Sequence, residues 1–469
     1  MSRGGKLAKN TIILAIGTFL PKLASFITLP ILTGCLSKES YGTYDLIVVL
    51  VSLFLPAVTL QIQTAAFRFL IDIRDKKENV KSIITNITAF ILPVSIVALI
   101  ILYFCLYKIN FKVRILICLY YFLDIFGNSL RQIVRGLSEN LKYSLSAIIN
   151  SVAQLIFVVV FVWYFKTGLF GSILSLAVAE LISVLYLFFS AGIYKFFDFK
   201  MVNIKEIKRM LAYSWPMVPN SMSMWVMRVS DRLVISFFMG VSANAVYAVA
   251  NKIPQLLTLA QTTFTMAWQE NASMVSKDED VDRYYSDMYR TMFDLMAGAM
   301  CMIIAFVPVL FIILVRGDYS EAYNQIPILL LGMFFYAVSA YLGGIYVAYM
   351  KTKSVGITTI VASVLNIVID VALINFIGLY AASLSTFISY LFLFFYRLKD
   401  VRKIVKIKYD LQHMILVFAL MTIVSILCML QNNTINILNF ILAFVVFIAL
   451  NRQFLRMAIN MVKKKVSRK

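Results

Sequence analysis

Charged residues and histidine are scarce in this sequence of 469 residues. Only 14% of the positions are charged and one residue, His413, is a histidine, whereas hydrophobic residues make up 61%. Soluble domains are about 25% charged and about 45–50% apolar, so the composition predicts a polytopic membrane protein. A single histidine excludes a His₂ or His₃ zinc site, and it lies at the start of a hydrophobic run rather than in a catalytic motif.

The cysteines also lack any functional spacing. All five are isolated, and none forms a CxxC pair or another ligand pattern. We interpret them as buried, inert thiols and expect no metal, no other cofactor and no catalytic residue. These cysteines are Cys35, Cys105, Cys118, Cys301 and Cys428.

Long hydrophobic runs are what the sequence has instead. About fourteen reach the roughly 20 residues that a membrane-spanning helix needs. They lack the alternation typical of a β-barrel, so the fold is predicted to be all-α. The first run is too long for a signal peptide and is expected to remain as a helix. The predicted spans are 10–33, 42–67, 82–106, 113–134, 143–165, 168–190, 211–239, 244–270, 288–315, 322–350, 355–376, 379–396, 411–430 and 434–454.

The net charge of +21 comes mainly from Lys and Arg residues outside these hydrophobic runs. Most of the 44 Lys and Arg residues lie at the two ends and in alternate connections, and few lie in the intervening ones. The positive-inside rule therefore places both termini in the cytoplasm of a cell-membrane protein. It also explains the charge without a nucleic-acid partner. The basic connections are 68–81, 131–142, 195–209, 277–290, 351–353 and 397–408.

Two basic connections, 191–210 and 397–410, divide the chain into three parts. Residues 1–190 and 211–396 hold six predicted helices each, and 411–469 holds two more helices and a basic tail. The two connections are amphipathic, and we expect them to lie in solvent or among lipid headgroups.

The two six-helix parts share short sequence similarities. Residues 168–175 (GLFGSILS) are similar to 378–385 (GLYAASLS), and Tyr44 and Tyr247 follow similar turns. Because six helices preserve orientation, this predicts a parallel repeat of two pseudo-symmetric lobes with a cleft between them and alternating access.

Four cations lie inside predicted spans: Lys22, Arg228, Arg232 and Lys252. A charge at the bilayer centre costs about 2.5–3.5 kcal/mol, so each one is a candidate functional residue. At 1.5 Å rise per residue, Lys22 and Arg228 lie about 18 Å below the external face and the other two about 12 Å. Arginine suits bidentate binding of phosphate oxygens, so these four residues predict an anionic, phosphate-bearing substrate.

Three acids lie in the same runs: Asp231, Asp124 and Glu180. Asp231 is expected to orient Arg232 or Lys252, or simply to form a salt bridge that holds the helices together. Asp124 and Glu180 are candidates for coupling to an H⁺ or Na⁺ gradient. Asn366 and Asp370, four residues apart in a later span, are interpreted as interhelical hydrogen-bonding residues.

A set of short motifs in the chain is shared with one known family. These motifs are Leu29–Thr33, Tyr41–Tyr44, Pro216, Pro219, Asp231–Ile235, Gly240, Tyr247, Tyr323, Ile326–Gly332, Asn366 and Gly378–Ala382. In them the chain resembles the polysaccharide-biosynthesis flippases for O-antigen and capsule repeat units, within the multidrug/oligosaccharidyl-lipid/polysaccharide exporter (MOP) superfamily. Departures include Ala245, Asp370 and Asn375, and the single Lys22 differs from the Arg-rich first helix of lipid II flippases.

The resemblance implies a fold similar to multidrug (MATE) transporters, with two six-helix lobes and a cationic central cavity. It also implies translocation of undecaprenyl-pyrophosphate-linked oligosaccharide across the bacterial cytoplasmic membrane, with a polymerase and a chain-length regulator as further partners. Two other functions stay open. A multidrug/cation antiporter of the same fold is expected to carry net-negative acids in its cavity. A membrane glycosyltransferase or polymerase usually needs a large catalytic loop, and no connection here is long enough.

Overall fold

The structure is a computed structural model that describes residues 3–73, 76–276, 278–452 and 456. Every regular element in these ranges is a helix. Twelve helices are long and apolar enough to cross a membrane. The predicted all-α polytopic membrane protein is therefore confirmed, whereas the number of fourteen spans and the layout of the lobes stay predictions. The chain forms two compact units, residues 1–226 and 227–469, which are described separately.

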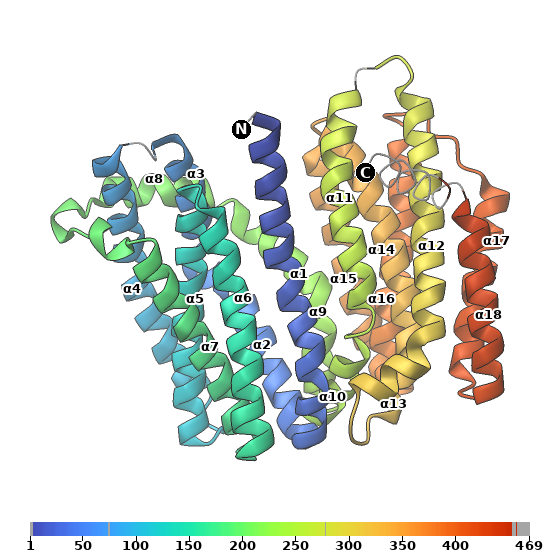
Figure 1. Cartoon of the computed structure of the whole chain (residues 1–469), viewed down its shortest axis with the longest axis horizontal. Helices are drawn as coiled ribbons and strands as arrows, with labels where there is room; N and C mark the ends of the chain where they lie inside the picture. The colour runs from blue at the N-terminus through green and yellow to red at the C-terminus, as the bar shows by residue number, and fades with distance from the viewer. Residues whose placement is uncertain (1–2, 74–75, 277, 453–455, 457–469) are drawn as a thin grey trace, which may run out of the picture. The chain divides into compact units, whose positions relative to one another are not determined.

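Unit 1 is a helical bundle built around α5, α6 and α7, which pack against one another (Figure 1). Helix α1 lies against α6, and α3 packs against both α4 and α5. The helices are α1 (Arg3–Cys35), α2 (Lys38–Thr59), α3 (Ile62–Ile73), α4 (Lys77–Cys105), α5 (Phe111–Gly136), α6 (Asn140–Phe157) with its π-helical extension η1 (Val158–Tyr164), α7 (Gly168–Ser190), η2 (Ile193–Phe196), η3 (Phe199–Met201), α8 (Ile204–Ser214) and the start of α9 (Met217–Phe238).

Unit 2 is centred on α14, which packs against α11, α12 and α16. The approach of α11 requires Gly344, because a Cβ atom there would lie 2.6 Å from the ring of Trp268. The Trp268 indole N–H donates to the Tyr341 carbonyl over 2.9 Å and fixes this contact. The helices are α10 (Val241–Ala250), α11 (Gln255–Val275), α12 (Val281–Leu314), α13 (Ser320–Tyr323), α14 (Gln325–Ala348), α15 (Thr352–Ile377), α16 (Leu379–Val401), α17 (Leu411–Met429) and α18 (Asn433–Leu450).

Several predicted spans are interrupted, including 211–239, which covers the end of α8 and the whole of α9. The run 42–67 is divided between α2 and α3, because Leu60 and Gln61 have left-handed φ values of 47° and 58°. The run 244–270 is divided between α10 and α11 by a turn that ends at Pro254. Proline lacks an amide hydrogen, so it is well tolerated just before a helix and poorly inside one.

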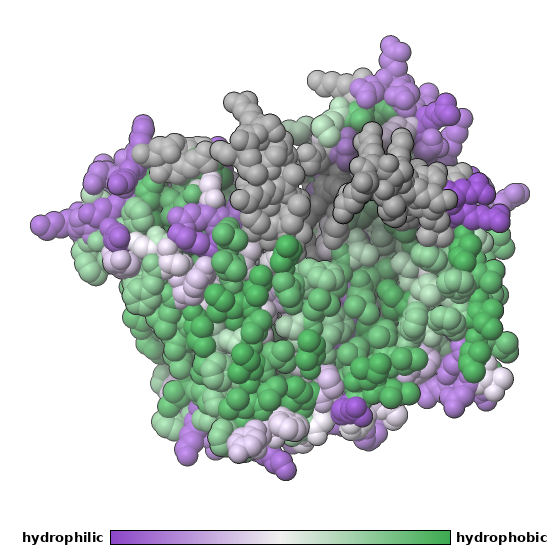
Figure 2. Space-filling view, in the orientation of Figure 1, coloured by the Kyte–Doolittle hydropathy of each residue, from purple (hydrophilic) through white to green (hydrophobic). Residues whose placement is uncertain are grey.

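Apolar side chains cover the outside of the helices. Figure 2 shows hydrophobic residues over the middle of the helices and hydrophilic residues near their ends. Phe104, Ile312 and Ile415 are among the most exposed hydrophobic side chains. A surface of this kind is favourable only in contact with lipid or another apolar partner.

The predicted basic linker 191–210 folds as η2, η3 and the first part of α8, and it is fixed to α4 by polar contacts. The Lys81 ammonium lies 3.1 Å from the Asp198 carboxylate. The Asn86 side chain donates to the Met201 carbonyl over 3.0 Å and accepts from the Asn203 amide over 2.6 Å. The hydrogen bond from Lys81 lowers the pKa of Asp198 below its usual range.

Candidate functional site

Asp231 lies on α9 and is 5% exposed, in the interior of unit 2. Its Oδ2 atom accepts a hydrogen bond from the Tyr247 hydroxyl of α10 over 2.6 Å and another from the Thr386 hydroxyl of α16 over 2.7 Å. Its Oδ1 atom is buried and has no hydrogen-bond partner among the described residues. The predicted pairing of Asp231 with Arg232 or Lys252 has no counterpart among these hydrogen bonds.

Asn366 and Asp370 of α15 belong to the same polar cluster. The Asn366 carbonyl oxygen accepts from the Ser230 hydroxyl over 3.0 Å, and its amide donates to the Ser385 and Thr386 hydroxyls over 3.2 and 3.4 Å. Asn366 is therefore the interhelical hydrogen-bonding residue that we predicted.

Asp370 differs from that prediction. It is fully buried, and neither of its carboxylate oxygens has a hydrogen-bond partner in the described part of the chain. An ionised carboxylate in such surroundings is costly unless a proton or a cation compensates its charge. Asp370 was not among the predicted site residues, although a lone acid inside an apolar run was the available signal.

The cluster of Asp231, Asn366, Asp370 and Thr386 therefore offers oxygen atoms of the kind that bind small hard cations. Three buried carboxylate oxygens, Oδ1 of Asp231 and both of Asp370, are free of hydrogen bonds within the described residues. The Tyr247 hydroxyl, which donates to Asp231, also lies 3.5 Å from the Ala382 carbonyl. The arrangement suits a proton or a monovalent cation better than an anionic group.

The four predicted substrate-binding cations occupy different parts of the chain. Arg228 and Arg232 lie one turn apart on α9, and the Arg232 side chain is half-buried. The Arg228 side chain lies outside the described residues. Lys252 is half-buried in the turn between α10 and α11, and Lys22 is half-buried on α1 of unit 1. Their action as one cation layer stays a prediction.

The interior of unit 1 holds the other two predicted acids. The Arg131 guanidinium of α5 lies 2.8 Å from the Glu180 carboxylate of α7 and 3.7 Å from the Asp124 carboxylate. Asn128 donates to Asp124 over 2.9 Å, and Asn150 of α6 donates to Glu180. Asp124 and Glu180 are thus brought together with one cation between them, which leaves the group with a net charge of −1 when all three are ionised.

The predicted connection 131–142 begins too early, because Arg131 lies inside α5 and is largely buried. It follows Asp124 by seven residues, two helical turns, and this spacing was the signal for a shared face. The predicted connection 397–408 also begins too early, because Arg397 lies inside a helix. It is 4% exposed inside α16 and donates to the Ser339 carbonyl and the Thr358 hydroxyl over 2.9 and 3.1 Å.

These apolar helices with charged groups held in their interior define a polytopic membrane protein. A family model described as "Polysaccharide biosynthesis protein" matches residues 7–269, so the chain belongs to this family. No protein in a search of curated sequences matches the chain.

Solved structures share the fold at low sequence identity. The chain is similar to a structure titled "Lipid II flippase MurJ, inward closed conformation", with 16% identity, a TM-score of 0.71, and coverage of 96% of this chain and 100% of that one. It is also similar to an inward-facing multidrug resistance MATE transporter of the MOP superfamily, with 15% identity, a TM-score of 0.67 and coverage of 84% and 98%. A MOP superfamily transporter from Pyrococcus furiosus matches with 13% identity, a TM-score of 0.56 and coverage of 84% and 95%. The predicted fold, similar to that of MATE transporters, is confirmed.

Proposed function

We propose that this protein is a flippase that moves undecaprenyl-pyrophosphate-linked oligosaccharide repeat units across the cytoplasmic membrane by alternating access. Membership of the polysaccharide biosynthesis family and a fold shared with a lipid II flippase support a lipid-linked substrate. The product would serve surface polysaccharide assembly, such as O-antigen, capsule or a teichoic-type polymer. A polymerase and a chain-length regulator are the expected partners.

The observation that carries the proposal is the position of two arginines on α9. Arg228 and Arg232 are one helical turn apart and lie inside α9 rather than at its ends. Phosphate oxygens are bound most strongly by such charge-assisted, planar donors. The pyrophosphate of the lipid carrier supplies an anion of this kind, and Lys22 and Lys252 would add to the attraction.

The coupling cation, H⁺ or Na⁺, is proposed to bind at Asp231 and Asp370. Both carboxylate oxygens of Asp370 and Oδ1 of Asp231 have no hydrogen-bond partner among the described residues, whereas Asp124 and Glu180 already face Arg131. We therefore assign the coupling role to unit 2 in preference to the predicted pair in unit 1.

The test is charge reversal at the two arginines. The variant Arg228→Glu/Arg232→Glu should lower surface polysaccharide by tenfold or more, because each lost charged contact is worth about 1.5–3 kcal/mol. Lys399→Glu, an exposed cation at the end of α16, is the matched control. Normal polysaccharide levels with equal amounts of the variant in the membrane would refute the proposal.

A multidrug/cation antiporter is the second candidate function, and the buried acids of unit 2 favour it. Comparing polysaccharide assembly with the export of cationic dyes distinguishes the two functions. A flippase is needed for polysaccharide assembly whatever its effect on drug tolerance. An antiporter alters the export of cationic dyes from cells and leaves polysaccharide unchanged.

A further inference from the structure

The two basic connections, 191–210 and 397–410, were predicted alike from the sequence but have different surroundings in the structure. In unit 1 the connection folds as η2, η3 and the first part of α8, and α8 packs against α3 and α4 (Figure 1). The contacts of Asp198 and Asn86 fix η3 and the start of α8 to α4. The protein itself therefore sets the shape of this segment.

Large apolar side chains of this segment are exposed. Phe199 of η3 is 77% exposed, Ile204 at the start of α8 is 68% exposed, and Trp215 at its end is 57% exposed. Tyr194 of η2 is also exposed, and its ring centroid lies 6.4 Å from that of the exposed Phe189 of α7. The apolar surface thus continues onto a helix that is long and apolar enough to cross a membrane. Tryptophan and tyrosine are enriched where a membrane meets water.

Lysines lie beside these apolar side chains. At about 100° per residue, Ile204, Lys208 and Trp215 fall within about 40° of one another around the axis of α8. Lys205 is about 60° from Lys208 on the same scale. Both lysines are exposed, and neither forms an ion pair with a described residue. A lysine stem can lie along an apolar surface while its ammonium group reaches polar groups at the membrane surface.

The charge of this segment is positive even when every carboxylate is ionised. Residues 191–215 contain five cations and two acids, which leaves a net charge of +3. Of the two acids, Asp198 lies 3.1 Å from Lys81 of α4, and Glu206 lies 3.3 Å from Arg209. The segment therefore attracts anions.

The connection from α16 to α17 in unit 2 has no comparable apolar surface. Its Val405 and Ile407 side chains are only 2% and 5% exposed, so they pack inside unit 2. The amphipathic character that both connections share therefore serves packing in unit 2, whereas in unit 1 the large apolar side chains remain exposed.

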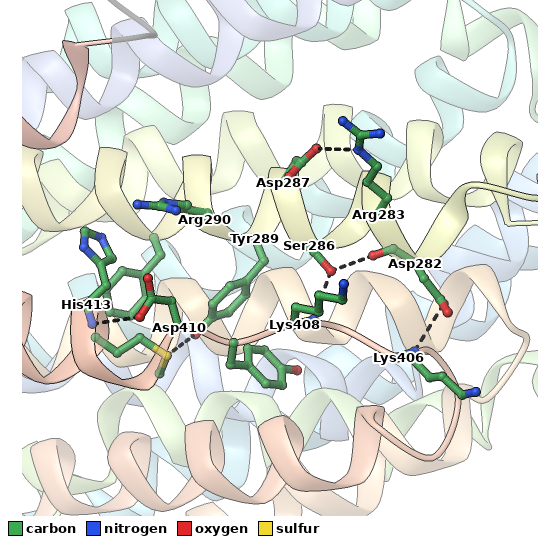
Figure 3. Close-up of a pocket in the computed structure, with 13 residues that line it drawn as sticks. Asp282, Arg283, Ser286, Asp287, Tyr289, Arg290, Lys406, Lys408, Asp410 and His413 are labelled. Atoms are coloured by element: carbon green, nitrogen blue, oxygen red, sulfur yellow. Dashed lines mark hydrogen bonds and ion pairs between the residues drawn. The ribbon is translucent and has the colours of Figure 1, made fainter.

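The charge at the connection in unit 2 is also balanced. Among the described residues, four cations line the cavity beside it, and they lie among three acids (Figure 3). A fourth acid, Asp294, lies 2.6 Å from the imidazole of His413, another lining residue. The three acids that line the cavity are Asp282, Asp287 and Asp410.

We propose that residues 194–215 bind anionic phospholipid headgroups, with Lys205 and Lys208 at the lipid phosphates. Ile204 and Trp215 lie among the upper parts of the acyl chains. Each lysine near an anionic membrane surface increases binding roughly fivefold. None of these residues belongs to the proposed coupling-cation site or to the predicted substrate cations, so the surface is independent of the proposed flippase activity.

Quenching of Trp215 fluorescence by brominated lipids measures this contact. The full-length protein is reconstituted into phosphatidylcholine vesicles that contain equal fractions of either brominated phosphatidylglycerol or brominated phosphatidylcholine. Subtracting the signal of Trp215→Phe removes the contribution of the other three tryptophans. The association constant obtained from quenching should be at least about fivefold higher for phosphatidylglycerol than for phosphatidylcholine.

Two double variants locate the preference. Lys205→Gln/Lys208→Gln should bind the two lipids about equally, because the two lysines supply the attraction. The matched control is Lys406→Gln/Lys408→Gln, which removes the same charge from exposed positions of the connection in unit 2. It keeps the backbone amides that hold this connection to α12, and it should keep the wild-type preference.

Each outcome decides the proposal. Loss of the preference in Lys205→Gln/Lys208→Gln alone supports the headgroup site. An equal loss in both variants shows a general effect of net charge and overturns the proposal, as does a preference that both variants retain. Equal quenching of the wild type by the two lipids, or no quenching of Trp215 by either, also overturns it. Thermal unfolding checks that the variants are folded, and Lys208→Gln alone replaces the double variant if that protein is not.

Discussion

Substitution of Asp370 by asparagine tests cation coupling directly. The change keeps the shape of the side chain and removes a negative charge that is fully buried without a hydrogen-bond partner among the described residues. A cation whose free concentration is one hundred times its dissociation constant for this site stabilises the folded protein by about 2.7 kcal/mol. Asp370→Asn should abolish this stabilisation, because the cation loses one of its two carboxylates.

Thermal unfolding of the purified protein measures the effect. Na⁺ is titrated against choline at constant ionic strength, and the pH is varied in a separate series. The wild type should unfold at a higher temperature as Na⁺ or proton concentration increases. Asp370→Asn should show little dependence on either, and in choline at neutral pH it should be more stable than the wild type, because a buried uncompensated charge is gone.

The control is Glu321→Gln, which removes one negative charge from an exposed position of α13. It should keep the response of the wild type. Asp231→Asn should lose the response as Asp370→Asn does, and the double variant should lose little more, because both residues act on one bound cation. An unchanged response of Asp370→Asn to Na⁺ and to pH would refute the assignment of the cation site.

Two further predictions concern unit 1. Glu180→Gln should destabilise the protein by about 1.5–3 kcal/mol in denaturant unfolding, because it removes the charge-assisted hydrogen bond of Arg131, while Asp124 still compensates the charge of Arg131. Asp198→Asn should increase hydrogen exchange in residues 193–203, because the contact with Lys81 is lost. Since the pKa of Asp198 is lowered, the wild-type contact persists above the usual aspartate pKa and is lost only as the pH falls through the lowered value. Protection of 193–203 should therefore be equal at pH 5 and pH 8.

The class of fold was predictable from hydropathy because helices are the only common way to satisfy backbone groups in lipid without a barrel. The interruptions were harder to predict. Leu60 and Gln61 interrupt a span without a glycine or proline, so no local signal marks the break. Arg131 and Arg397 lie at the ends of apolar runs, where a long cation suits a connection as well as a buried position.

The candidate cation site shows the same limit. Asp231 was identified from its helix, but its hydrogen-bond partners come from two other helices that sequence alone does not bring together. Asn366 and Asp370 share a face of α15, which predicted that they are close to each other. Only the packing of α15 shows that Asn366 is fully bonded and Asp370 is not.

The adjacency of Asp231 and Arg232 links the cation to the substrate. Consecutive helical residues point about 100° apart, so Asp231 lies in the interior while Arg232 is only half-buried. Two unit charges about 8 Å apart interact by about 2 kcal/mol at an effective dielectric constant of 20. A cation on Asp231 weakens this attraction, so Arg232 should interact more strongly with the pyrophosphate.

Cation and substrate should therefore bind cooperatively, and each should strengthen the other by the same factor. An interaction of about 2 kcal/mol corresponds to roughly thirtyfold in affinity. The measurement is the dissociation constant of undecaprenyl pyrophosphate with and without Na⁺, and at two pH values, for the wild type and for Asp231→Asn. The variant should bind the lipid tightly under every condition, because it lacks the carboxylate that attracts Arg232. Weaker binding by Asp231→Asn would show that the carboxylate supports Arg232 and does not compete with the phosphate.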